Sequence, residues 1–149
     1  MSKVSVLMAS PEGVVLAVLQ HLRNAKIDHA TGCFAEEFRF KDHGIGLEFK
    51  EKERLAEFFE KMREFYPHSS IVTDAILVSG EDVIAEWTLQ ATLTEPFYGR
   101  LSRKVPVSLH GASIVRTDNG KITDWADYYD GLTSRRTALA AYFTEWVEL

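Results

Sequence analysis

The first part of the chain carries apolar residues at the spacing of a helix. Val14, Val18 and Leu22 recur every four residues and form one broad apolar stripe. The segment Ser10-Pro11-Glu12 before them supplies an N-cap, a proline at the first helical position and an acidic first turn. The pattern therefore predicts an amphipathic helix that begins at Pro11.

Two shorter elements and a second long helix are expected next. Asp28 is placed to cap a short helix that runs through Cys33 and Phe34, and an extended segment then begins at Phe38 and ends among the glycines at 44–46. Helical spacing returns over residues 50–66, and Pro67 ends it. One side of this helix is expected to be apolar and to carry Leu55, Phe58, Phe59, Met62 and Phe65.

After Pro67 the period changes from helix to strand. Residues 83–94 alternate strictly between two faces, one of them apolar, which is typical of a half-buried strand. Further strands are predicted over 71–78, 105–117 and 122–130. Asp118-Asn119-Gly120 joins the last two and is a strong hairpin signal. A final helix is predicted from Thr133, with an apolar side made of Leu139, Tyr142, Phe143 and Trp146.

Helices followed by an antiparallel meander indicate an α+β fold of one domain, residues 1–149, with the helices on one face of a curved sheet. Such a sheet can leave a cavity between its concave face and the helices.

Charge and composition narrow the possible partners. The chain has 17 Lys and Arg against 22 Asp and Glu, a net charge of −5, so nucleic acid and anionic membranes are not expected partners. The basic group Arg100, Arg103 and Lys104 is explained by a solvated turn between strands. The apolar runs near the N-terminus are too short for a signal peptide or a membrane span, so a cytoplasmic protein is expected.

Several kinds of chemistry lack their usual residues. The five histidines never recur at helical spacing and there is one cysteine, so neither a metal site nor a disulfide is expected. No glycine-rich phosphate loop follows a strand, so no cofactor is implied. Cys33 lies among core residues and is interpreted as a structural thiol.

The last predicted strand carries the most promising carboxylates. Trp125, Asp127 and Tyr129 share one face, whereas Asp130 lies on the other face with Ala126 and Tyr128, so either Asp127 or Asp130 points toward the core. Burial disfavours the ionised form of a carboxyl group and raises its pKa toward the range used in acid/base catalysis. An aspartate bonded only to backbone or tyrosine is the structural alternative.

Two segments resemble a known superfamily. Residues 34–42 after a short helix, and residues 120–130 near the end, are similar to the nuclear transport factor 2-like superfamily, and more narrowly to its SnoaL-like branch. The resemblance in element order covers residues 11–132. It implies a cone-shaped curved sheet wrapped around N-terminal helices, a deep apolar pocket and a homodimer. The relatives include polyketide cyclases, ketosteroid isomerase and limonene-1,2-epoxide hydrolase.

The resemblance to the epoxide hydrolase extends to only part of its catalytic residues. Its catalytic aspartate, in a Trp-Arg-Asp-Tyr-Phe-Asp segment, matches Asp127. The places of its Arg-x-Asp pair fall on Trp87 and Leu89, and those of its water-holding Tyr and Asn fall on Phe40 and Asp42. The resemblance therefore implies that most of the epoxide-opening residues are absent, which leaves epoxide hydrolysis through Asp127 as the weakest alternative.

The resemblance to the isomerase and the cyclases implies two further catalytic candidates, Asp42 and His110. The general base of ketosteroid isomerase matches Asp42, whereas its oxyanion-binding Tyr and Asp fall near Val18 and Ala112. His110 lies two residues from the latter place on the same strand face. SnoaL-type cyclases use a His and an Asp on the last strands, which matches His110 and Asp127.

The leading hypothesis is a cofactor-independent acid/base isomerase, cyclase or hydrolase for an apolar, carbonyl-bearing or polycyclic small molecule. Asp42 or Asp127 would transfer the proton and His110 would polarise the carbonyl or shuttle the proton. The apolar walls would be formed by Phe40, Phe59, Trp87, Leu89 and Tyr129. The alternative is a binding or dimerising module of the same fold, in which Asp42 only starts a turn, His110 is a satisfied core histidine and Trp87 fills the core. His43 and Tyr98 would border the pocket mouth or lie in water.

Two expectations concern contacts. If the face of His110, with Pro106, Ser108, Ala112 and Ile114, lines the pocket, Asp127 on the next strand would come within hydrogen-bond reach of the imidazole. The outward face of strand 83–94 is rich in threonine and has only Glu86 ionised, which favours a two-fold partner and a homodimer.

Overall fold

The computed structural model describes residues 10–93 and 105–133. The elements are α2 (Pro11–Arg23), α3 (Ile27–Gly32), β1 (Phe34–Asp42), β2 (Leu47–Phe49), α4 (Lys52–Phe65), β3 (Ser70–Ser79), β4 (Asp82–Leu93), β5 (Val105–Asp118) and β6 (Lys121–Tyr129). The predicted helix from Thr133, the basic group at 100–104 and Tyr98 lie essentially outside these residues. Among the described residues, no helix is long and apolar enough to cross a membrane.

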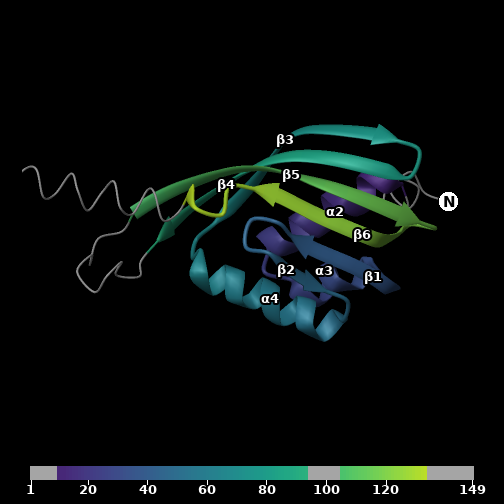
Figure 1. Ribbon diagram of the computed structural model, residues 1–149, viewed down its shortest axis with the longest axis horizontal. Helices are drawn as coiled ribbons and strands as arrows, with labels where there is room; N and C mark the ends of the chain where they lie inside the picture. Colours follow the sequence, from purple (N-terminus) through teal and green to yellow (C-terminus); the bar gives the residue numbers. More distant parts are fainter. Residues whose placement is uncertain (1–9, 94–104, 134–149) are drawn as a thin grey trace, which may run out of the picture.

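The six strands form one curved sheet in the order β2-β1-β6-β5-β4-β3, with the three helices gathered on one side of it (Figure 1). This confirms the α+β fold. All neighbouring strands are antiparallel except β1 and β6, which run parallel. The parallel pair and the short strand β2 were not predicted. Both depend on pairing between segments that are distant in the sequence or too short to show a period.

Helix α2 begins as the sequence indicates. The side chain of Ser10 accepts a hydrogen bond from the Gly13 amide (3.0 Å), and Pro11 takes the first turn, where its missing N–H costs nothing. The buried face of the helix consists of Val14, Val15, Val18 and Leu19. Helix α2 therefore packs its apolar stripe on the sheet.

The short helix differs from the prediction. It is capped by Lys26 without a side-chain hydrogen bond, and Asp28 lies inside its first turn. The helix ends at Gly32, and Phe34 already belongs to strand β1. The reason is tertiary: Phe34 is 1% exposed and pairs with Ile122 of β6, and that burial outweighs one more turn of a short helix.

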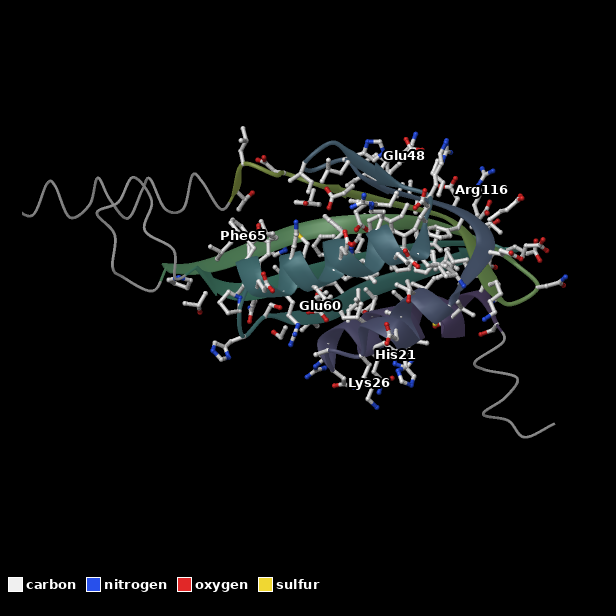
Figure 2. The ribbon with its side chains drawn as sticks, turned by 90° about the horizontal axis from the view of Figure 1, so that it is seen from below. His21, Lys26, Glu48, Glu60, Phe65 and Arg116 are labelled. Atoms are coloured by element: carbon white, nitrogen blue, oxygen red, sulfur yellow. The ribbon has the colours of Figure 1, made fainter. Side chains whose placement is uncertain are left out.

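The end of α4 also differs from the prediction. Phe65, expected on the apolar side, is the last residue of α4 and is 49% exposed (Figure 2). Tyr66 is the C-cap of the helix and has a non-helical backbone, which directs its own side chain inward. Tyr66 is therefore only 7% exposed. The helical period no longer applies once the helix has ended.

The strands and the final hairpin follow the predicted pattern. Asp118 pairs with Lys121 across a two-residue loop, in which Asn119 and Gly120 have φ values of 48° and 75°. Asparagine and glycine adopt this left-handed conformation most easily, which explains why the sequence signal was reliable.

The core lies between the helices and the concave face of the sheet and is rich in aromatic rings. Phe40 of β1 stacks on Trp125 of β6, with ring centroids 6.3 Å apart, and meets Phe59 of α4 edge-on at 5.5 Å. Phe34 and Phe58 complete the contact between these layers. These rings hold β1, β6 and α4 together around one end of a cavity.

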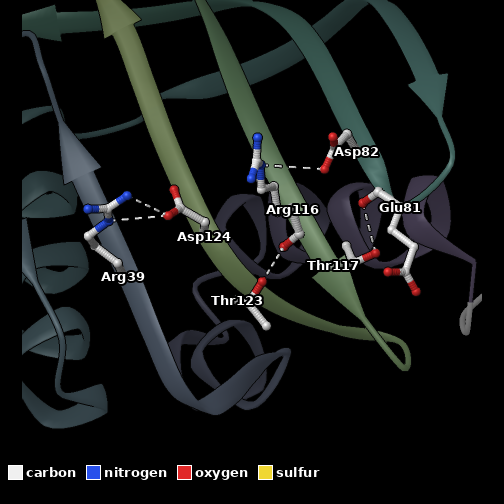
Figure 3. A network of polar contacts seen from close by, with 7 residues as sticks. All are labelled: Arg39, Glu81, Asp82, Arg116, Thr117, Thr123 and Asp124. Carbon is white, nitrogen blue, oxygen red and sulfur yellow. Dashed lines mark hydrogen bonds and ion pairs between the residues drawn. The ribbon is translucent and has the colours of Figure 1, made fainter.

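The opposite, outer face of the sheet carries a row of charges (Figure 3). Arg116 is the register partner of both Asp82 and Asp124, and Asp124 is also the partner of Arg39. The Arg39–Asp124 pair is 2.9 Å long and the Arg116–Asp82 pair 3.7 Å. Exposed pairs of this kind contribute about 0–1 kcal/mol each, so the row mainly marks this end of the outer face as polar.

Candidate active site

A cavity of about 140 Å³ lies between α2, α4 and the concave face of the sheet. The five residues predicted to form its walls all line it, namely Phe40, Phe59, Trp87, Leu89 and Tyr129. Asp42 and Asp127 line it as well, and they are direct neighbours on the parallel strands β1 and β6. The structure therefore brings two of the three predicted catalytic residues together in an apolar chamber.

The carboxyl group of Asp127 is held by one of its oxygens. Its Oδ1 accepts hydrogen bonds from the Ser113 hydroxyl (2.5 Å) and the Trp125 indole (2.6 Å). The Ser113 oxygen itself accepts a bond from the Trp87 indole (2.9 Å), so its proton is directed to Asp127. Within the described residues the other oxygen, Oδ2, accepts no hydrogen bond. Every fully buried side-chain oxygen in that part of the chain has a partner, so Oδ2 is not fully buried. Because Asp127 lines the cavity, Oδ2 is the oxygen that a ligand there can reach.

The surroundings of Asp127 favour its protonated form. Burial raises the pKa of Asp127 from 3.8 to about 7, and the negative charge of Asp42 acts in the same direction. The hydrogen bonds from Ser113 and Trp125 oppose the rise in this pKa without cancelling it. Because Oδ1 already receives two protons in hydrogen bonds, the titrating proton belongs on Oδ2, the oxygen that faces the cavity.

Asp42 is more fully satisfied than Asp127. It is 3% exposed; its Oδ2 accepts a bond from the Tyr129 hydroxyl (2.9 Å) and its Oδ1 one from the Ile45 amide (3.1 Å). Burial raises the pKa of Asp42, and the bonds from Tyr129 and the amides of Ile45 and Gly44 oppose that rise. Asp42 thus starts the turn after β1, as the structural alternative expected, and also borders the cavity.

Tyr129 is fixed by its contact with Gly44. A Cβ atom at Gly44 would lie 2.2 Å from the Tyr129 ring, so only glycine lets the ring lie against this turn. Burial and the Asp42 carboxylate raise the pKa of Tyr129, so its hydroxyl stays protonated and donates to Asp42. The lone pairs of the Tyr129 oxygen remain available as acceptors.

His110 does not belong to this group of residues. It is exposed on the outer face of the sheet, with Nδ1 3.0 Å from the Thr88 hydroxyl, and Thr88 donates to Asp74 (2.6 Å). The expected contact between His110 and Asp127 was wrong, because β5 presents its other face to the cavity, and Ser113 occupies the register position opposite Asp127. His110 is therefore neither a pocket residue nor a core histidine.

Sequence reasoning missed Ser113, although a signal was present. Ser108, His110 and Arg116 make one face of strand β5 polar, while Val107, Leu109 and Val115 make the other apolar. Comparison of the two faces would have placed Ser113 inside and His110 outside. The resemblance-based place of Ala112 is on the outer face too, whereas Val18 lines the cavity.

Other candidates have structural roles. Asp127 of β6 lines the cavity, whereas Asp130, which follows the strand, is exposed. His43 is exposed and stacks on Tyr128 with ring centroids 4.3 Å apart. Cys33 is half-buried, its thiol lies 3.4 Å from the His29 carbonyl oxygen, and burial raises its pKa, which agrees with a structural thiol. The described residues include no cluster of three or more His, Cys, Asp or Glu side chains suited to a metal ion.

The polar atoms left for a ligand deep in the cavity are few. Both indole N–H groups and the Ser113 hydroxyl are engaged with protein partners. What remains on the sheet side is Oδ2 of Asp127, which donates when protonated, and the oxygen of Tyr129, which accepts. This arrangement can deliver a proton at one point and receive one at another.

Comparison with known proteins identifies the fold. IdmH from Streptomyces antibioticus, a candidate polyketide cyclase, is 14% identical with a TM-score of 0.76, over 85% of this chain and 96% of that one. A protein with a ketosteroid isomerase-like fold from Catenulispora acidiphila is 18% identical, with a TM-score of 0.74, over 87% of this chain and 93% of that one. An epoxide hydrolase from M. tuberculosis, similar to the limonene enzyme, is 19% identical, TM-score 0.67, over 91% and 94%.

The family is shown by the sequence itself. Comparison with the curated proteins yields no match. The sequence profile of the SnoaL-like domain, in contrast, matches residues 15–125, which is most of the chain. It agrees with the curved sheet, the covering helices and the structural neighbours described above. The chain therefore belongs to the SnoaL-like domain family.

Proposed function

We propose that this protein is a cofactor-independent acid/base enzyme that acts on an apolar small molecule with a carbonyl group. The observation that carries the proposal is Oδ2 of Asp127, an oxygen open to an apolar cavity on a carboxyl group with a pKa of about 7. A group that titrates near neutral pH and reaches the cavity is suited to general acid/base catalysis.

In this proposal Asp127 acts as the general acid, and Asp42 is the general base that acts through Tyr129. Protonated Asp127 donates its Oδ2 proton to the carbonyl oxygen of the substrate. A proton on the neighbouring carbon passes to the Tyr129 oxygen while the Tyr129 hydroxyl proton passes to Asp42, which gives an enol and a neutral Asp42. The reverse steps return both protons. Tyr129 stays neutral throughout, which agrees with its raised pKa.

The size of the cavity supports a small reacting group. A closed apolar cavity of about 150 Å³ accommodates benzene, and this one measures about 140 Å³. We therefore expect one six-membered ring, free or as the end of a larger molecule, to occupy the space in front of Asp127. A polycyclic substrate would insert one ring at a time.

Proton exchange tests this function without knowledge of the natural substrate. Cyclohexanone in D₂O exchanges its α-protons when it enolises, and the protein should accelerate this exchange in a saturable manner. NMR of the ketone follows the exchange, and titration of the labelled protein follows binding. Binding of the ketone without accelerated exchange would contradict the enzyme proposal and favour the non-catalytic binding module.

Epoxide hydrolysis through Asp127 is the weaker alternative. The places of the family's Arg-x-Asp pair are occupied by Trp87 and Leu89, which are walls of the cavity. Neither side chain carries a charge, so the Arg-x-Asp pair has no counterpart here. A small cycloalkene oxide incubated with the protein tests this alternative directly, and release of the diol would support it.

We further propose that the chain forms a homodimer through the outer face of its sheet. That face exposes Val72, Leu77, Ile84, Ile114 and Tyr128, each at least 40% exposed. Leu77, Ile84 and Ile114 are register partners and form one continuous apolar row. Rows of this kind are stabilised when a second sheet covers them.

Sedimentation at micromolar concentration should therefore show twice the chain mass of 16.9 kDa. Ile84→Lys, which places a charge in the middle of the row, should shift the population to monomer. Leu132→Lys, at an exposed site after β6, is the control. A wild-type chain that sediments as a monomer would refute this assembly.

A further inference from the structure

Two arginines border the cavity that holds the carboxyl groups. Arg23 is the last residue of α2, Arg63 lies in the last turn of α4, and both line the cavity although both are exposed. Asp42 and Asp127 belong to the sheet, on the opposite wall. The cavity therefore has carboxyl groups on its sheet wall and a rim that includes two exposed arginines at the ends of the covering helices, with apolar side chains between.

The positive charge at this rim is only partly matched by the protein. Arg63 binds a single oxygen of Glu60, through Nη2 at 2.9 Å and Nε at 3.3 Å, and leaves Nη1 unused. Arg23 forms no ion pair or hydrogen bond with any residue in the described part of the chain. The rim thus offers planar N–H donors of the kind that bind a carboxylate in a forked geometry.

We infer that the rim formed by Arg23 and Arg63 binds a carboxylate of the ligand, so that the natural ligand is an organic acid with an apolar body. The inference rests on the proposed use of this cavity as the ligand site. It also sets the orientation of the ligand. The negative charge of Asp42 repels an anion from the inner wall, and the arginines attract it to the opening. The uncharged end of the ligand then faces Asp127.

A matched pair of probes tests the inference. Cyclohexylacetate and cyclohexylacetamide have the same ring and nearly the same shape, but only the first is an anion near neutral pH. Binding is measured by protein NMR titration at low salt. Because hydrogen bonds between charged groups are stronger than those to a neutral amide, the carboxylate should bind at least about tenfold more tightly than the amide.

Variants locate the effect. Arg23→Gln and Arg63→Gln should each weaken binding of cyclohexylacetate about tenfold and leave binding of the amide unchanged. Arg54→Gln is the matched control, because Arg54 forms the same type of pair with Glu57 on α4, at 3.2 Å, but does not line the cavity. Added salt should weaken binding of the carboxylate alone.

Equal affinity of the two probes, failure of both to bind, or equal losses of both in the arginine variants would overturn the inference. Its outcome is separable from that of the proposed enzyme activity. Carboxylate selectivity that depends on the arginines, in a protein that does not accelerate proton exchange, would refute the enzyme and preserve the anion subsite. Accelerated proton exchange without carboxylate selectivity would refute the anion subsite and preserve the enzyme proposal.

Discussion

Asp127→Asn should gain stability relative to the natural chain as pH rises. The difference in the free energy of unfolding between the two proteins should be up to about 4 kcal/mol larger at alkaline pH than at about pH 4. Burial raises the pKa of Asp127 in the folded chain from 3.8 to about 7. Between these values the folded chain keeps a proton that the unfolded chain has lost, so the free energy of unfolding falls as pH rises. Above about pH 7 both states are ionised and the loss is complete.

Urea unfolding followed by tryptophan fluorescence, repeated across this pH range, measures the difference between the two proteins. The control is Glu64→Gln, at an exposed position of α4 away from the sheet, which should differ from the natural chain by no more than about 0.5 kcal/mol. A constant difference between Asp127→Asn and the natural chain would show that burial does not perturb Asp127. The acid/base proposal would then lose its main support.

Asp127→Asn should also slow proton exchange into cyclohexanone by about 10²- to 10⁴-fold, the usual contribution of a general acid or base. Asparagine keeps the shape and the bond to Ser113 but cannot release a proton. The loss should fall on kcat, because the ketone is still held by the apolar walls. In the natural chain the rate should decline as pH rises through about 7, since the protonated form of Asp127 is the acid.

Ser113→Ala refines the same experiment. The Ser113 hydroxyl lowers the pKa of Asp127, so its removal should move the midpoint of the pH–rate profile upward by about one pH unit. Ser108→Ala, on the exposed face of the same strand, should leave the midpoint unchanged. A midpoint that is identical in all three proteins would show that the rate does not report on Asp127.

The local elements of this fold are legible in the sequence because each depends on neighbouring residues. Ser10 and Pro11 mark the start of α2, Asn119 and Gly120 the last hairpin, and strict alternation marks β4. Alternation also placed Asp127 and Tyr129 on one face, together with Trp125. The apolar walls of the cavity could be named for the same reason.

The candidate site itself was decided by tertiary structure. A period of two defines the two faces of a strand but does not say which face the helices cover. On β5 the covered face carries Ser113, which faces Asp127, and His110 lies on the exposed face instead. The parallel pairing of β1 with β6 set Asp42 beside Asp127, although 85 positions separate them in the sequence. The perturbed pKa of Asp127 follows from the same packing, since desolvation and the charge of a neighbour depend on distances through space and not along the chain.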